Sequence, residues 1–412
     1  MSSLLTNTSA MVSLQTLRVI NKDLGATQNQ ISTGMRIANA RDNAALWSIA
    51  TVMRSDVTGF KAISESLALG SATLNVGRDG AETVASLLDQ LKGRVVTAQE
   101  ENVDRNKVQA DVRELVDQIR VVVAGSQFNG LNLLNGDREV SVLASMNRSA
   151  VAGLPDDVAP DYVKFRTQDL STTAGVEGGG GPIPDAMSIE APVGFTNPLA
   201  AGEDLEIEFP ARAVNAGDSY RITLTNTDGD DFIYLYVAAQ GDTLNDVVSG
   251  LARQISLDAP DDGGGRVAVT RAADPTTQAP RLSFRSDTED YTVALGTQTG
   301  STEPTGRLRG IDKFDVSTDR GAAAALQAME HFIQSAINAA AHFGSAQGSV
   351  DSADMFVGRL IDSLTEGVGA LVDADMEAAS ARLQALQVQQ QLGIQALSIA
   401  NQQPQNILAL FQ

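Results

Sequence analysis

Apolar residues recur every seven positions in two long stretches, one toward each end of the chain. The N-terminal series comprises Leu17, Leu24, Ile31, Ala38, Ala45 and Val52, and the C-terminal series comprises Val357, Leu364, Leu371, Ala378, Ala385, Leu392 and Ile399. A sustained seven-residue repeat is typical of helices that pack along their length. The pattern predicts paired helices built from both ends, with an ordinary antiparallel bundle inside one globular domain as the alternative.

The two extreme ends carry no charged side chain: residues 1–17 and 383–412 lack Asp, Glu, Lys and Arg. A surface helix normally keeps a charged outer face. We therefore expect these ends to cover each other and then to be covered by identical neighbours. The residues expected at this assembly interface are Leu14, Leu17, Leu24, Ile31, Leu383, Leu392 and Ile399.

Glycine and asparagine mark where the N-terminal helices stop. Gly34 and residues 38–43 should interrupt the first helix and leave a less regular connector, because glycine, asparagine and aspartate favour turns. Two helices are expected next, over 47–99 and 105–123. Asn129-Gly130 is a strong turn dipeptide, which predicts a short hairpin starting near residue 131.

The middle of the chain alternates apolar and polar residues with a period of two. The runs 220–225 and 232–237 flank Asp228-Gly229-Asp230-Asp231, which predicts a hairpin. Residues 243–257 predict an amphipathic helix with Thr243 or Asp242 as its N-cap. Further strands are expected over 205–209, 266–270, 282–285 and 291–295. The expected fold is mainly α: a coiled-coil-like bundle of long helices from both termini, with a surface α+β insert of ββαββ-like order.

Proline and charge divide the chain in the same way. Eleven of the twelve prolines lie between Pro155 and Pro304, and residues 137–315 hold 29 acidic and 14 basic side chains. The net charge of −21 argues against nucleic acid or an anionic membrane as a partner. No window is apolar enough to predict a membrane span, and the N-terminus lacks the pattern of a cleaved signal peptide. We expect a cytoplasmic protein or one exported by another route.

Little in the sequence predicts catalysis or a cofactor. The chain has no cysteine and two histidines, His331 and His342, which we interpret as ordinary helix residues. The acidic turn at 228–231 lacks the rest of a calcium loop, and the glycines at 178–181 are not followed by Lys-Ser or Lys-Thr. We expect no enzyme activity, no catalytic or metal site and no cofactor. An enzyme or adhesin activity of the middle module is the alternative from another class.

Three motifs nevertheless resemble one family. They are ISTGMRIANARDNAA at 31–45, FNGLNLLNG at 128–136, and VDADME at 372–377 with ANQQPQNILAL at 400–410. Together they resemble the bacterial flagellins, of the alphaproteobacterial type. The residues that carry the resemblance are Gly34, Arg36, Asp42, Phe128, Asn129, Gly130, Asp373, Asp375, Asn401 and Pro404.

The resemblance implies an architecture and a function. It implies an inner-tube helix and connector at 1–46, outer-tube helices at 47–140, a variable surface domain at 141–312, a C-terminal outer-tube helix at 313–358 and an inner-tube helix at 359–412. Such a chain polymerises into the extracellular flagellar filament for swimming, is exported unfolded without a cleaved signal, and folds on assembly. The alternative is a hook–filament junction protein of the same plan.

The implied partners are copies of the chain itself, with or without sibling flagellins. The resemblance adds the filament cap and hook-junction proteins, the type III export apparatus, and an export chaperone that covers residues 383–412. It implies neither nucleic acid nor membrane as a partner.

The sequence departs from the family pattern in two places. Asn43 and Leu46 stand where the family usually has a second Asp and a Gly, and Trp47, expected to pack at a helix or subunit junction, follows them. The family's site for some vertebrate toll-like receptors corresponds here to Lys92 and Gln118. Because lysine lacks the bidentate fork of arginine, we expect weak recognition by that receptor.

Overall fold

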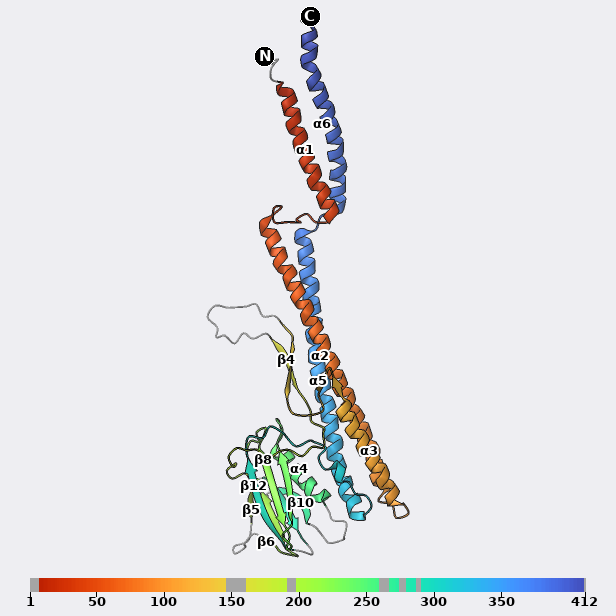
Figure 1. The fold of residues 1–412 in the computed structure, drawn as a ribbon, viewed down its shortest axis with the longest axis vertical. Helices are drawn as coiled ribbons and strands as arrows, with labels where there is room; N and C mark the ends of the chain where they lie inside the picture. Colours follow the sequence, from red (N-terminus) through yellow and green to blue (C-terminus); the bar gives the residue numbers. More distant parts are fainter. Residues whose placement is uncertain are drawn as a thin grey trace. The chain divides into compact units, whose positions relative to one another are not determined.

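A computed structural model of the 412-residue chain describes the backbone of residues 7–145, 161–190, 198–258, 267–273, 279–286 and 290–410. The side chains of residues 190, 198 and 403–410 lie outside that description. Contacts divide the chain into two compact units (Figure 1), residues 1–65 with 145–159 and 354–412, and residues 66–144 with 160–353. The expected fold class, mainly α with a β-rich insert, is confirmed.

Six α-helices and one short 3₁₀ helix are present in the described part of the chain. They are α1 (Thr8–Thr33), α2 (Ala44–Thr97), α3 (Arg105–Gly125), α4 (Leu244–Leu257), η1 (Ile311–Lys313), α5 (Asp319–Val372) and α6 (Met376–Leu410). The helices expected at 47–99 and 105–123 are confirmed to within three residues. The first helix ends as expected, with Gly34 in the left-handed conformation at φ 70°.

All four expected domain divisions fall inside an element. The divisions after residues 46 and 358 lie within α2 and α5, and those after 140 and 312 lie within β3 and η1. The break between the last two long helices, α5 and α6, lies at Asp373–Asp375. Composition and periodicity report what kind of surface a segment packs on, whereas caps and turns fix where a helix ends.

Helices α2 and α5 carry seven-residue repeats that line the core of the second unit. The buried series on α2 is Leu67, Leu74, Ala81, Leu88 and Val95, and the buried series on α5 is Ala322, Met329, Ala336, Phe343 and Val350. Arg78 Nη1 donates to Gln347 Oε1 at 2.7 Å, and Lys92 Nζ donates to Glu330 Oε2 at 3.0 Å. These contacts place α2 and α5 side by side, as the seven-residue pattern predicts.

A hairpin follows α3 and rests on glycines of α2. Strands β1 (Gln127–Phe128) and β2 (Leu131–Asn132) flank Asn129-Gly130, whose φ angles are 49° and 78°. The dipeptide is therefore the turn itself, so the hairpin begins at Gln127 and not near residue 131 as expected. The next residues, Leu133 and Leu134, are buried against Gly77 and Gly80 of α2.

The described residues of the β-rich insert form two four-stranded antiparallel sheets in addition to a separate pair, β3 (Glu139–Leu143) with β4 (Tyr162–Arg166). One sheet has the order β10-β11-β7-β5 and the other the order β6-β12-β8-β9. The bounds are β5 Ser188–Glu190, β6 Pro198–Leu199, β7 Asp204–Glu208, β8 Ser219–Thr225, β9 Asp231–Val237, β10 Ala268–Ala273, β11 Pro280–Arg285 and β12 Tyr291–Gln298. The expected order ββαββ is present as β8-β9-α4-β10-β11, but its two hairpins belong to different sheets.

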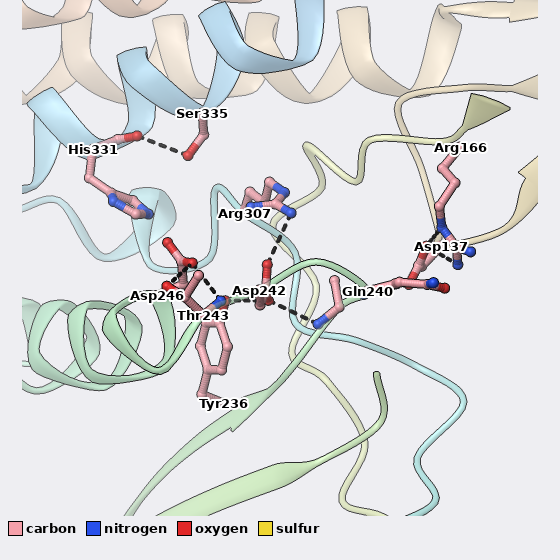
Figure 2. Close-up of polar contacts among 11 residues, drawn as sticks. Asp137, Arg166, Tyr236, Gln240, Asp242, Thr243, Asp246, Arg307, His331 and Ser335 are labelled. Atoms are coloured by element: carbon pink, nitrogen blue, oxygen red, sulfur yellow. Dashed lines mark hydrogen bonds and ion pairs between the residues drawn. The ribbon is translucent and has the colours of Figure 1, made fainter. Parts of the chain in front are cut away.

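Helix α4 contacts β9, β10 and β11 and so packs against both sheets (Figure 1). Of the two expected caps, Thr243 is the N-cap: its main-chain N–H and its hydroxyl both donate to Asp246 Oδ2, at 2.8 and 2.7 Å. Asp242 has another role (Figure 2). It accepts hydrogen bonds from the hydroxyl of Tyr236 at 2.8 Å and from Arg307 Nη2 at 3.1 Å.

Candidate functional site

Helices α1 and α6 form a pair within the first unit (Figure 1). Their inward positions alternate by three and four residues, which is the spacing of a coiled-coil seam. On α1 these positions are Ala10, Ser13, Leu17, Ile20, Leu24, Thr27 and Ile31, and on α6 they are Ala379, Leu383, Leu386, Gln390, Gly393, Leu397 and Ala400. All are buried or half-buried. The seam therefore consists of small and apolar residues with one glutamine.

Amide groups supply the hydrogen bonds between side chains of this pair and the facing helix. Gln390 Nε2 donates to Asn21 Oδ1 at 2.6 Å, and Asn7 Nδ2 donates to the main-chain oxygen of Ala400 at 2.8 Å. Asn7 also caps α1, because its Oδ1 accepts from Ala10 N at 3.0 Å. A methyl group on Gly393 would lie 3.2 Å from Leu17 Cγ, so the two helices are closely spaced there.

The remaining faces of α1 and α6 leave large apolar side chains uncovered. These side chains are Met11, Val12, Leu14 and Val19 on α1, and Val388, Leu392, Ile394 and Ile399 on α6. Leu392 is 58% exposed and Ile399 is 64% exposed. Within the part of the chain that the structure describes, nothing packs on these faces. An exposed apolar surface of this kind marks an interaction site.

The structure divides the expected interface residues into two groups. Leu17, Leu24, Ile31 and Leu383 lie in the seam between α1 and α6, whereas Leu14, Leu392 and Ile399 are exposed. The C-terminal seven-residue series thus changes role at the break between α5 and α6: Val357 is buried, but Ala378, Ala385, Leu392 and Ile399 are exposed. The break resets the helical phase, so α6 turns a different stripe toward α1.

Six residues of the α6 seam were not among the expected interface residues: Ala379, Leu386, Gln390, Gly393, Leu397 and Ala400. A signal for them was present. Ala379, Leu386, Gly393 and Ala400 also recur every seven residues, and Leu383, Gln390 and Leu397 complete the alternation of three and four between them. The signal is weak because alanine, glycine and glutamine contribute little to an apolar pattern.

The family-signature residues near both ends meet in one connector of the first unit. The main-chain N–H groups of Arg36 and Ile37 donate to the carbonyl of Val372 at 2.7 and 3.3 Å, and Ala374 N donates to the carbonyl of Gly34 at 2.9 Å. Met35 and Asp373 form an isolated antiparallel bridge. The connector therefore joins two segments that are far apart in the sequence.

Two signature aspartates shape this connector. Asp42 Oδ2 accepts from Ala38 N and Asn39 N at 3.1 and 3.2 Å, which closes the turn after α1. Asp375 Oδ1 accepts from Glu377 N and Ala378 N, both at 3.0 Å, and so caps α6. Trp47 packs beside a small core of Ile37, Ala50, Val368 and Val372, so its expected position at a helix junction is confirmed.

The other signature residues do not join the connector. Phe128, Asn129 and Gly130 form the β1–β2 turn in the second unit. Asn401 is exposed on α6, and the side chain of Pro404 lies outside the described residues. The two positions that correspond to the receptor site, Lys92 and Gln118, take no part in the connector. Lys92 pairs with Glu330, and Gln118 Nε2 donates to Glu114 Oε1 at 3.2 Å.

Neither a metal site nor a membrane helix is found in the described ranges. No group of three or more His, Asp and Glu side chains there could hold a metal ion. The described helices include none that is long and apolar enough to cross a membrane. The acidic turn before β9 is closed by its own hydrogen bonds, from Asp230 N to Asn226 Oδ1 at 2.7 Å and from Thr225 Oγ1 to Asp231 Oδ1 at 2.6 Å.

Comparison with known families matches both ends of the chain. Residues 4–139 match the bacterial flagellin N-terminal helical region, and residues 326–411 match the bacterial flagellin C-terminal helical region. Over the full length of both chains, the sequence is 31% identical to flagellin D of Rhizobium meliloti strain 1021 and 33% identical to a flagellin A of Rhizobium meliloti. A flagellin of Brucella melitensis is 37% identical over 41% of this chain and 59% of its own length.

Solved structures of low identity are also similar. FliC from Burkholderia pseudomallei is 13% identical, with 68% of this chain and 99% of that chain covered and a TM-score of 0.31. Flagellar hook-associated protein 3 from Legionella pneumophila is 12% identical, with 78% and 98% covered and a TM-score of 0.33.

Proposed function

This chain belongs to the bacterial flagellin family, whose members are structural subunits of the flagellar filament. We propose that its uncovered helical faces are the surfaces through which it assembles into that filament. The observation that carries the proposal is the exposed apolar surface of α1 and α6 around Val19, Leu392 and Ile399. Residues 1–17 and 383–412 carry no charged side chain, so little keeps these segments soluble in a single subunit. Identical neighbours cover the surface when subunits stack.

The assembly that follows is an open helical polymer. Contacts between different patches of identical subunits continue without closing and so build a fibre. In this scheme Leu17, Leu24, Ile31 and Leu383 hold α1 against α6, while Leu14, Leu392 and Ile399 contact neighbouring subunits. Residues 1–46 and 359–412 form the inner tube, residues 47–140 and 313–358 form the outer tube, and residues 141–312 face the solvent.

Export and assembly are coupled in the same proposal. The α1–α6 pair buries little surface by itself, so these segments stay largely unfolded until neighbours cover them. The chain passes through the type III export channel unfolded, with an export chaperone on residues 383–412 beforehand. It folds beneath the filament cap, outside the cell, in a filament that begins at the hook-junction proteins.

One experiment separates the filament subunit from a hook–filament junction protein. Deletion of the gene removes the long filament if the chain is the filament subunit. If the deletion instead releases unpolymerised flagellin into the medium, the chain acts at the junction. Polymerisation of the purified chain onto short filament seeds supports the first result independently. The isolated middle domain, assayed for binding and hydrolysis, tests the enzyme and adhesin alternatives.

A further inference from the structure

A small cavity lies where α4 and β10 meet α5 in the second unit. Its volume is about 60 Å³, and its polar lining comprises Ser249, Arg253, Ser256, Arg271, Gln327 and His331. This is room for roughly four water molecules or one small ion, since about 15 Å³ holds one water. Two arginines and a histidine from three elements therefore line one half-open pocket.

Arg253 is the unusual member of this group. It is 7% exposed, and in the described part of the chain neither its Nε nor its Nη1 has a hydrogen-bond partner. Its guanidinium lies 4.8 Å from the ring centroid of Phe332, which fixes its orientation without using its N–H groups. A buried charge without a partner is costly, so such groups are normally paired.

The surroundings of the cavity do not neutralise Arg253. Burial and then repulsion from Arg271 lower its pKa to about 10, while Tyr236 opposes that change. The nearby carboxylates are engaged elsewhere: Asp246 caps α4, and Asp242 pairs with Arg307 (Figure 2). Arg271 Nη1 donates to Ser249 Oγ at 2.7 Å, which holds the second guanidinium at the cavity.

We propose that this cavity binds a small oxyanion of the size of inorganic phosphate. Arg253 and Arg271 would donate charge-assisted hydrogen bonds to it, and Ser256 and His331 would complete its shell. Arginine suits such a ligand because its planar N–H groups match the oxygens of phosphate. The bound anion joins the β-rich insert to α5 through side chains of both.

The test uses the full-length monomeric chain, with its two histidines labelled for NMR. Sodium phosphate is added at constant pH and ionic strength, with sodium chloride as the matched salt. The His331 resonance should shift to saturation with phosphate and not with chloride, while the His342 resonance stays in place. The Arg253→Met variant should bind phosphate roughly ten-fold more weakly or worse, since charge-assisted hydrogen bonds are lost.

Two further variants keep the result interpretable. Arg271→Gln removes the second charge without touching the buried guanidinium and should also weaken binding, which decides the case if Arg253→Met does not fold. Arg212→Gln alters an arginine outside the cavity, which donates to the carbonyl of Pro184, and should bind phosphate as the original chain does. An equal response to chloride, or unchanged affinity in Arg253→Met or Arg271→Gln, would overturn the proposal.

Discussion

The guanidinium of Arg36 donates a 2.9 Å hydrogen bond to the main-chain carbonyl of Leu371, 335 residues further along the chain. The carbonyl belongs to the last turn of α5, which has no later turn to accept from. One side chain from the segment after α1 thereby provides a hydrogen-bond donor for a free carbonyl at the end of a helix from the other half of the chain.

Replacing Arg36 with Met should therefore loosen the connector. One hydrogen bond of this kind contributes about 1 kcal/mol or somewhat more, because the donor is charged. Filaments of Arg36→Met should depolymerise at a lower temperature, measured by light scattering during heating. Arg41→Met is the matched control, since within the described residues the side chain of this neighbouring arginine makes no hydrogen bond or ion pair with α5, and its loss should leave the midpoint unchanged.

The exposed residue Leu392 tests the assembly surface. Leu392→Asp should leave the acidic insert folded, because Leu392 lies on α6 and is 58% exposed, but should prevent polymerisation by burying an unpaired charge between subunits. Seeded polymerisation followed by electron microscopy measures the effect. Leu392→Met keeps the volume and should still assemble. Normal filaments from Leu392→Asp would remove this face from the assembly core.

Two glycines of α2 should respond oppositely to alanine. A methyl group on Gly80 would overlap the Oγ of Ser126 and lie 2.9 Å from Leu134 Cδ1, whereas one on Gly93 would meet nothing within 4 Å. We expect Gly80→Ala to destabilise the second unit by about 1–3 kcal/mol. Gly93→Ala should stabilise it by up to about 1 kcal/mol. Guanidinium unfolding followed by circular dichroism measures both, and equal effects would contradict the close packing of the hairpin on α2.

His331 should make stability depend on pH. Burial, then repulsion from Arg253, lowers its pKa from 6.5 to about 3 in the folded chain. Below pH 6.5 the imidazole of His331 is protonated in the unfolded chain but stays neutral in the folded chain. The free energy of unfolding therefore falls as the pH falls from about 6.5 toward 4. The slope is at most about 1.4 kcal/mol per pH unit.

The His331→Gln variant isolates this effect from the carboxylates, which also titrate in acid. Urea unfolding of both proteins near neutrality and in mild acid should show a flatter profile for the variant. Parallel profiles would mean that His331 takes up its proton in the folded state.

Lys92 bears on recognition by the vertebrate toll-like receptor. Its ammonium forms an ion pair with Glu330 at 3.0 Å, so it is already bound within the subunit. Lysine also lacks the bidentate hydrogen bonding of the arginine that the family has at this position. We expect a receptor reporter cell line to respond weakly to the purified monomer. Lys92→Arg should raise the response only modestly, because Gln118 also departs from the family pattern. A potent response to the original chain would refute this expectation.

The sequence predicted the long helices, the strands β7 to β12 of the insert and an N-cap at Thr243 or Asp242, because each is encoded by local periodicity and turn chemistry. It did not predict which stripe of α6 faces α1. That choice depends on Asp375, which starts a new helix after Val372 and resets its rotation, and no count across the break detects it. The cavity around Arg253 was also beyond prediction, since its lining residues come from three elements that only tertiary packing brings together.

The bridge between Met35 and Asp373 makes the connector depend on a chain that has been synthesised almost to its end. A ribosome that stops before Asp373 releases a product with a complete α1 but with nothing to pair against it. Such a fragment lacks Asp373 and the whole of α6, so it has neither the bridge to Met35 nor the exposed apolar face of α6. We therefore expect the connector to act as a check on length that keeps truncated products out of the polymer.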